Sequence, residues 1–176
     1  MNPSRAIAFV LVGWAALIAT GVVTALVGTQ RWVPDVTLVI VLYLALGTRG
    51  QGAPSSSALV ALVLGYLSDL LSSAPRGLHA ATHVIVMLVV RAAAGRLLVT
   101  RVWQEEVVSI VVALAHGLLV IALAAPLYDG NAGGALRELP RMAIATAFVT
   151  PFLFKLLRLV DHKLAPDPRS LRMPHL

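Results

Sequence analysis

The sequence contains no cysteine, so disulfide bonds, thiolate metal sites and cysteine nucleophiles are all excluded. Charge is also scarce: Asp, Glu, Lys and Arg together make up 12% of the chain, whereas a soluble domain carries about 25%. So few charges cannot cover a water-facing surface. What the chain has instead is apolar, because 59% of its 176 residues are hydrophobic. Long apolar runs of this kind indicate a protein that crosses a membrane several times.

The motifs of common enzymes and cofactor-binding proteins are missing as well. The sequence has no G-x-S-x-G nucleophile elbow, no phosphate-binding P-loop, no dinucleotide-binding glycine fingerprint and no EF-hand loop. We therefore expect a protein that is not an enzyme and that carries no cofactor. The net charge of +6 is interpreted as an excess of basic residues on one side of a membrane, and no nucleic-acid partner is expected.

Six apolar segments are separated by polar turns rich in glycine and proline, which predicts an all-α fold. A helix needs about 20 apolar residues to cross a bilayer. The predicted helices cover residues 7–27, 33–48, 55–71, 77–98, 107–127 and 140–160, and residues 135–141 are expected to lie along the membrane interface. We expect one six-helix transmembrane domain over residues 1–164 and a polar cytoplasmic tail over residues 165–176.

The distribution of basic residues predicts the topology. If the N-terminus is cytoplasmic, ten of the fourteen Lys and Arg residues fall on the cytoplasmic side of six spans. The positive-inside rule then favours a membrane protein with both termini in the cytoplasm. A five-span count would move the basic tail outside. On the six-span topology, residues 72–77 lie on the outer face, and we call this segment the hinge.

Asp69, just before the hinge, is the acid that lies well inside an apolar run. Charges within a membrane span are costly and tend to be paired or functional. Two roles stay open for Asp69. The carboxylate either holds the hinge, by accepting backbone N–H bonds or pairing with Arg76, or it contacts a ligand or partner.

His79 and His83 follow the hinge and are four residues apart, so they share one face of a helix. Histidines at this spacing can chelate zinc, but a site needs a third ligand, and Asp69 is the candidate nearby. We expect no metal here and assign both histidines to interhelical hydrogen bonds or to a polar crevice. His116 stands alone in its apolar segment and is expected to be a bundle histidine with satisfied hydrogen bonds.

Residues 65–80, GYLSDLLSSAPRGLHA, resemble the signature of the rod shape-determining protein MreD family. That signature has the pattern G-x-x-x-D-L-L-x followed by P-x-G-x-x-A, and its residues here are Gly65, Asp69, Pro75, Gly77 and Ala80. The Pro34-Asp35 pair that opens the second predicted helix also resembles the family. Arg76 stands where the family usually has a bulky apolar residue.

The resemblance implies a non-enzymatic part of the cell-elongation machinery. Such a protein partners the single-span protein MreC and, through it, the MreB filament and the peptidoglycan synthases. The family's fold is similar to the substrate-binding S-components of energy-coupling-factor transporters, which implies a crevice that opens outward. The candidate residues for this crevice, or for partner binding, are Asp69, Pro75, Arg76, Gly77, His79 and His83. An S-component-like small-molecule binding subunit is the alternative function.

Overall fold

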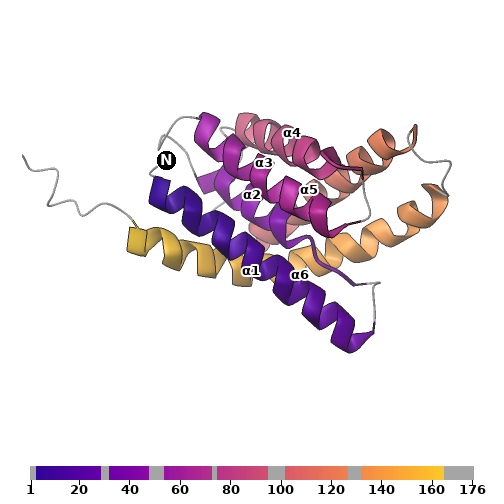
Figure 1. Cartoon of the computed structure of the whole chain (residues 1–176), viewed down its shortest axis with the longest axis horizontal. Helices are drawn as coiled ribbons and strands as arrows, with labels where there is room; N and C mark the ends of the chain where they lie inside the picture. Colours follow the sequence, from indigo (N-terminus) through magenta and orange to yellow (C-terminus); the bar gives the residue numbers. More distant parts are fainter. Residues whose placement is uncertain are drawn as a thin grey trace, which may run out of the picture.

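The computed structural model describes residues 3–28, 32–47, 54–72, 75–94, 102–126 and 132–164. Within these ranges all regular structure is α-helical, which confirms the predicted fold class. The helices are α1 (Pro3–Val27), α2 (Val36–Gly47), α3 (Pro54–Leu71), α4 (Leu78–Ala94), α5 (Val102–Ala124) and α6 (Ala132–Leu164). Figure 1 shows α1 and α6 along one edge of the bundle and α3 and α4 along the opposite edge.

Helix α2 forms the centre of the bundle. Every residue from Val36 to Ala45 is buried, and each of the other five helices contacts α2. A helix that is apolar all round is stable only when protein or lipid surrounds it. Here the surroundings are protein, and the core combines α2 with side chains from its neighbours, including Phe9, Leu64, Met87 and Phe154.

Close helix packing depends on small residues, as is usual in membranes. Helix α3 packs along α4, and α5 packs along α6. Gly65 of α3 faces the backbone of α4, where an added Cβ would lie 2.5 Å from both the Cα of Ala80 and the carbonyl oxygen of His79. Gly117 of α5 likewise makes room for Leu139 of α6. These glycines set how near the paired helices approach.

Three helices, α1, α5 and α6, are long and apolar enough to cross a membrane. The other three are shorter. Helix α2 has 12 residues, which corresponds to about 18 Å at 1.5 Å per residue, against a hydrocarbon core of about 30 Å. The buried α2 therefore does not need to reach both surfaces. The predicted six-span topology, with cytoplasmic termini, stays a prediction.

Two predicted boundaries were wrong, and in both cases contacts between helices explain the difference. Helix α5 begins at Val102 rather than at residue 107, so the polar residues 104–106 are helical. Glu105 is buried there and pairs with Arg158 of α6. Helix α6 begins at Ala132 rather than at residue 140, so residues 135–141 belong to this continuous helix, and their place along the interface stays a prediction. Leu139 is buried against Gly117, which attaches this segment to α5.

The remaining boundaries are close to expectation. Helix α2 begins at Val36 rather than at residue 33, because Asp35 caps the helix from outside. Helix α4 is described as far as Ala94. Residues 95–98, which were predicted to continue it, lie outside the described residues, as do Ser73 and Ala74 of the hinge and the predicted tail at 165–176.

An ion pair joins the first and last helices. Arg5 of α1 contacts Asp161 of α6, with 2.5 Å between Nε and Oδ1 and 2.6 Å between a terminal guanidinium nitrogen and Oδ2. The Tyr43 hydroxyl, near the end of α2, donates to Asp161 Oδ2 at 3.1 Å. The beginning of α1 and the end of α6 therefore lie at the same end of the bundle (Figure 1). An even number of spans requires this arrangement.

We predict that Gly65→Ala destabilises the bundle by about 1–3 kcal/mol, because the new methyl group forces α3 away from the α4 backbone. Thermal unfolding of the purified chain in detergent measures the effect. Gly21→Ala is the matched control, since a Cβ at Gly21 meets nothing within 4 Å. The control is expected to change stability by less than about 1 kcal/mol. Equal melting temperatures for the two variants would contradict the proposed close contact.

Candidate functional site

The Asp69 carboxylate organises the hinge and the start of α4. Its Oδ2 accepts hydrogen bonds from the backbone N–H groups of Gly77 at 2.9 Å and Ala80 at 3.2 Å. Its Oδ1 accepts from the backbone N–H of His79 at 2.8 Å and from His79 Nδ1 at 2.9 Å. The first N–H groups of a helix have no partner within the helix. Asp69 supplies that partner from the preceding helix, and its side chain is fully buried.

Gly77 gives the hinge its sharp return into α4. Its φ is +91°, in a region where side chains cause strain. The Leu78 N–H donates to the Pro75 carbonyl at 3.1 Å, and the Ala81 N–H donates to the Gly77 carbonyl at 2.9 Å. The turn therefore closes through its own backbone, and the Asp69 carboxylate fastens it to α3.

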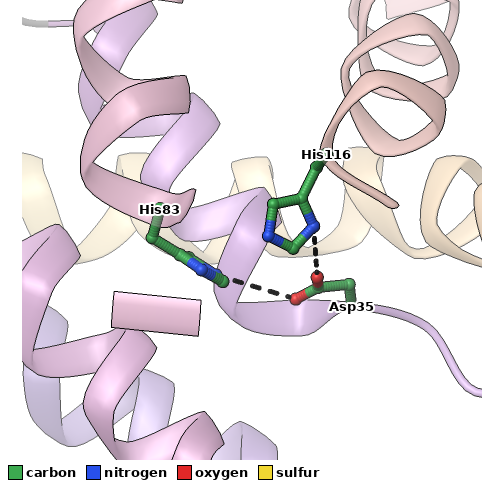
Figure 2. A group of neighbouring side chains, drawn as sticks. All are labelled: Asp35, His83 and His116. Atoms are coloured by element: carbon green, nitrogen blue, oxygen red, sulfur yellow. Dashed lines mark ion pairs between the residues drawn. The ribbon is translucent and has the colours of Figure 1, made fainter. Parts of the chain in front are cut away.

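A second polar group lies at the start of α2 (Figure 2). Asp35 stands at the start of α2, His83 comes from α4, and His116 comes from α5. His116 Nδ1 is 3.3 Å from Asp35 Oδ2, and His83 Nε2 is 4.0 Å from Asp35 Oδ1. Both histidines are buried, and the Asp35 side chain is 15% exposed. We call these three residues the Asp–His cluster.

Hydrogen bonds of Asp35 and Thr37 tie the Asp–His cluster to three helices, α2, α3 and α6. Asp35 Oδ1 accepts from the Leu38 backbone N–H at 2.9 Å, which caps α2, and from the Thr37 hydroxyl at 2.9 Å. The Asp35 backbone N–H donates to the Thr146 hydroxyl of α6 at 3.0 Å. Thr37 Oγ1 also lies 3.0 Å from Ser68 Oγ of α3. Polar side chains from separate helices thus satisfy one another where α2 begins, as membrane interiors require.

A cleft of about 830 Å³ opens beside the Asp–His cluster. The second half of α1 forms an apolar wall with residues such as Leu17, Ile18 and Val22. The lining outside α1 combines apolar residues such as Val33 and Leu71 with polar ones, which are Asp35, Thr37, Ser68, Ser72 and His79. The cleft exists because α2 is short: its non-helical approach, residues 33–35, lies beside α1 instead of a full-length helix. Irregular backbone within a membrane protein is tolerated where it is buried or lines a cavity.

Comparison with protein families identifies the chain. The family model described as rod shape-determining protein MreD matches residues 4–160, which is most of the sequence. The chain belongs to the MreD family. It is therefore a membrane protein with a role in determining rod shape, from a family that is not known for enzymatic activity. No match was found among curated proteins or among solved structures, so the likeness to S-components rests on the sequence resemblance alone.

The six predicted site residues do not gather at one place. His79 lines the cleft, and Asp69 is buried beneath the hinge. Arg76 is exposed, while Pro75 and Gly77 are half-buried. His83 was expected near the mouth of a crevice but is fully buried, because its ring points to Thr37 of α2, with 3.1 Å between Nε2 and Oγ1.

The hydrogen bonds of Asp69 follow the first of its two predicted roles, the one in which it holds the hinge through backbone N–H groups. His83 makes the interhelical hydrogen bond that was predicted. A ligand or partner role for the candidate residues stays a prediction.

Sequence reasoning missed the grouping of Asp35 with His116 in this MreD-family chain. His116 was expected to be a bundle histidine with satisfied hydrogen bonds. Its Nε2 lies 3.1 Å from the Thr82 hydroxyl, but its Nδ1 faces Asp35 and has no hydrogen-bond partner among the described residues. A signal was available, because ionisable residues inside apolar segments usually face the bundle interior and pair with one another. Asp35 and His116 both interrupt apolar runs, but the sequence does not show that their helices are neighbours.

We predict that Asp69→Asn destabilises the chain by about 1–3 kcal/mol, because the amide nitrogen faces backbone N–H donors that lose their acceptor. Thermal unfolding in detergent measures the loss. Glu138→Gln is the control, since Glu138 forms an exposed pair with Arg141 on α6, and such pairs contribute less than about 1 kcal/mol. If Asp69→Asn and Glu138→Gln melt alike, Asp69 does not hold the hinge.

Proposed function

We propose that this chain is a multi-pass inner-membrane component of the bacterial cell-elongation machinery. In this role it binds a MreC-like single-span protein and, through that partner, the MreB filament and the peptidoglycan synthases. It thereby helps to localise wall synthesis and to maintain cell shape. The observation that carries the proposal is the MreD family match over residues 4–160.

The distribution of polar groups supports a scaffold rather than a catalyst. Within the described part of the chain, the buried carboxylate of Asp69 accepts backbone hydrogen bonds, that of Asp35 caps α2, and that of Glu105 pairs with an arginine. The buried hydroxyls of Thr150 and Ser109 donate to backbone carbonyls of their own helices, and that of Thr37 donates to Asp35. These groups maintain the bundle and leave its outer surface apolar.

Helix α1 offers the surface that suits a single-span partner. Only Phe9 and Gly13 are buried along its described length. Trp14, Ile18 and Val22 recur every four residues and are 43–52% exposed, so they form one apolar stripe. Ile18 and Val22 also border the cleft. We place the transmembrane helix of the MreC-like partner on this stripe, where its apolar side chains would pack against apolar side chains at the edge of the cleft.

We predict that replacing Trp14, Ile18 and Val22 together by alanine weakens co-purification of the MreC-like partner in mild detergent by about tenfold, which corresponds to about 1.4 kcal/mol. The matched control replaces Phe148 and Phe152 of α6, which are 74% and 68% exposed. The control is expected to retain the partner. If the wild-type chain is folded and fails to retain a MreC-like partner, the proposed function is wrong. Equal loss in both variants places the partner elsewhere.

The topology has a separate test. Because the chain contains no cysteine, a single introduced cysteine is the one thiol that can be labelled. Cysteine is introduced at Arg137 or at His162, both exposed on α6. A membrane-impermeant maleimide applied to spheroplasts is expected to label the Arg137→Cys chain, whereas the His162→Cys chain is labelled only after lysis. The reverse pattern would place the termini outside.

The cleft favours a second candidate function, a small-molecule binding subunit similar to an S-component. Its volume of about 830 Å³ falls within the range of ligand pockets, roughly 300–1,000 Å³, and one apolar wall faces polar side chains. Thermal-shift screening with vitamins and with lipid-linked wall precursors separates the two functions. A tight vitamin ligand favours the second candidate, and binding of a MreC-like partner without such a ligand favours the first.

A further inference from the structure

The Asp–His cluster brings three ligand atoms of metal-binding chemistry to one point. Asp35, His83 and His116 each offer one such atom, and these atoms all lie within 4.8 Å of one another. The three residues come from the start of α2, from α4 and from α5, and they converge as Figure 2 shows. Two imidazoles and one carboxylate form a ligand set typical of zinc and of other divalent transition metals.

The hydrogen bond that Thr82 makes to the His79 carbonyl favours one tautomer of the His116 ring. The Thr82 hydroxyl donates its one hydrogen to the His79 carbonyl at 3.1 Å. Thr82 Oγ1 can then only accept from His116 Nε2, 3.1 Å away. In a neutral ring this leaves the lone pair on Nδ1, which has no hydrogen-bond partner among the described residues. That lone pair faces Asp35 Oδ2 at 3.3 Å.

The same accounting applies to His83. Its Nδ1 donates to the His79 carbonyl at 2.8 Å, since a carbonyl can only accept. The lone pair of neutral His83 is therefore on Nε2, which faces Thr37 and Asp35. Thr37 has one hydroxyl hydrogen and lies within reach of both His83 Nε2 and Asp35 Oδ1. One of these two acceptors stays without that hydrogen.

Two imidazole lone pairs and one carboxylate thus face a shared point. The donor hydrogens there are fewer than these hydrogen-bond acceptors. Like acceptors repel one another inside a protein unless a cation lies between them. A proton on His116 is the simplest cation, but a charge-assisted N–H···O bond measures about 2.7–2.9 Å, and the observed Nδ1–Oδ2 distance is 3.3 Å. Ligands of a tetrahedral ion at 2.0–2.2 Å stand about 3.4 Å apart.

We propose that Asp35, His83 and His116 bind a divalent transition-metal ion, of which Zn²⁺ is the representative. The hydrogen bonds to the His79 carbonyl and to Thr82 are the outer contacts that orient metal-binding histidines in known sites. The His83 Nε2–Asp35 Oδ1 distance of 4.0 Å shortens by about 0.5 Å when an ion closes the set. Magnesium and calcium are disfavoured because they prefer oxygen ligands.

Access and purpose follow from where the cluster lies. Of its three residues, Asp35 also lines the cleft, so an ion reaches the cluster from the cleft side. Three protein ligands leave one position of a tetrahedral ion open. A bound ion ties the start of α2 to α4 and α5 and fixes the floor of the cleft. The proposal does not depend on the proposed partner, because it rests on the cluster alone.

The test uses the full-length chain, purified without a histidine tag, stripped with a chelator and folded in detergent. Zn²⁺ is expected to bind with one ion per chain and to raise the melting temperature by several degrees. Co²⁺ is expected to give the visible absorption of a nitrogen- and oxygen-ligated ion. His116→Gln is expected to weaken Zn²⁺ binding by at least about tenfold, and Thr82→Val, which frees the His116 ring, by about 10–100-fold.

His162→Gln is the matched control, because His162 is an exposed histidine in the last turn of α6. It is expected to bind Zn²⁺ as the wild-type chain does. Circular dichroism and size-exclusion chromatography establish that each variant is folded before binding is compared. The proposal is overturned if the wild-type chain binds no Zn²⁺ and gives no Co²⁺ absorption, which would leave a proton as the cation. It is also overturned if His116→Gln binds as tightly as the control.

Discussion

A helix of 12 residues lies at the centre of this bundle, and its length constrains everything around it. Because α2 is too short to cross a bilayer, its first turn begins inside the protein, where water does not satisfy the backbone. Asp35 supplies the cap, Thr146 accepts the Asp35 N–H, and Thr37 links the turn to α3 and α4. The cleft occupies the space that a longer α2 would fill. Cap, polar cluster and cleft are therefore consequences of one short helix.

The bundle carries polar contacts at both ends of α2, and they differ in character. At its end, the Tyr43 hydroxyl meets an ion pair in which Arg5 and Asp161 compensate each other directly. At its start, one carboxylate faces two buried imidazoles. The first arrangement pairs opposite charges of the protein's own side chains. The second has the ligand types of the metal site proposed above.

Much of the fold was predictable, because apolar runs and polar turns determine helices in a membrane. The predicted segments at 55–71 and 7–27 correspond closely to α3 and α1. The early start of α5 was not predictable from the local sequence, because the partner of the buried Glu105, Arg158, is 53 residues away. The role of Asp69 was predictable because its donors lie within 11 residues. The Asp–His cluster was not predictable, because its residues belong to the start of α2, to α4 and to α5, and the sequence does not show that these helices are neighbours.

The contact between Arg5 and Asp161 also bears on how the chain is made. The two residues are 156 positions apart, so Arg5 leaves the ribosome long before its partner is synthesised. Helices enter the membrane in order, and long-range contacts form late. The Tyr43 hydroxyl of α2 also bonds to Asp161, so this particular contact of α1 and α2 forms only once α6 has been made. The final helix thus supplies the carboxylate that pairs with Arg5. In a chain whose synthesis stops before Asp161, Arg5 of α1 lacks this ion-pair partner.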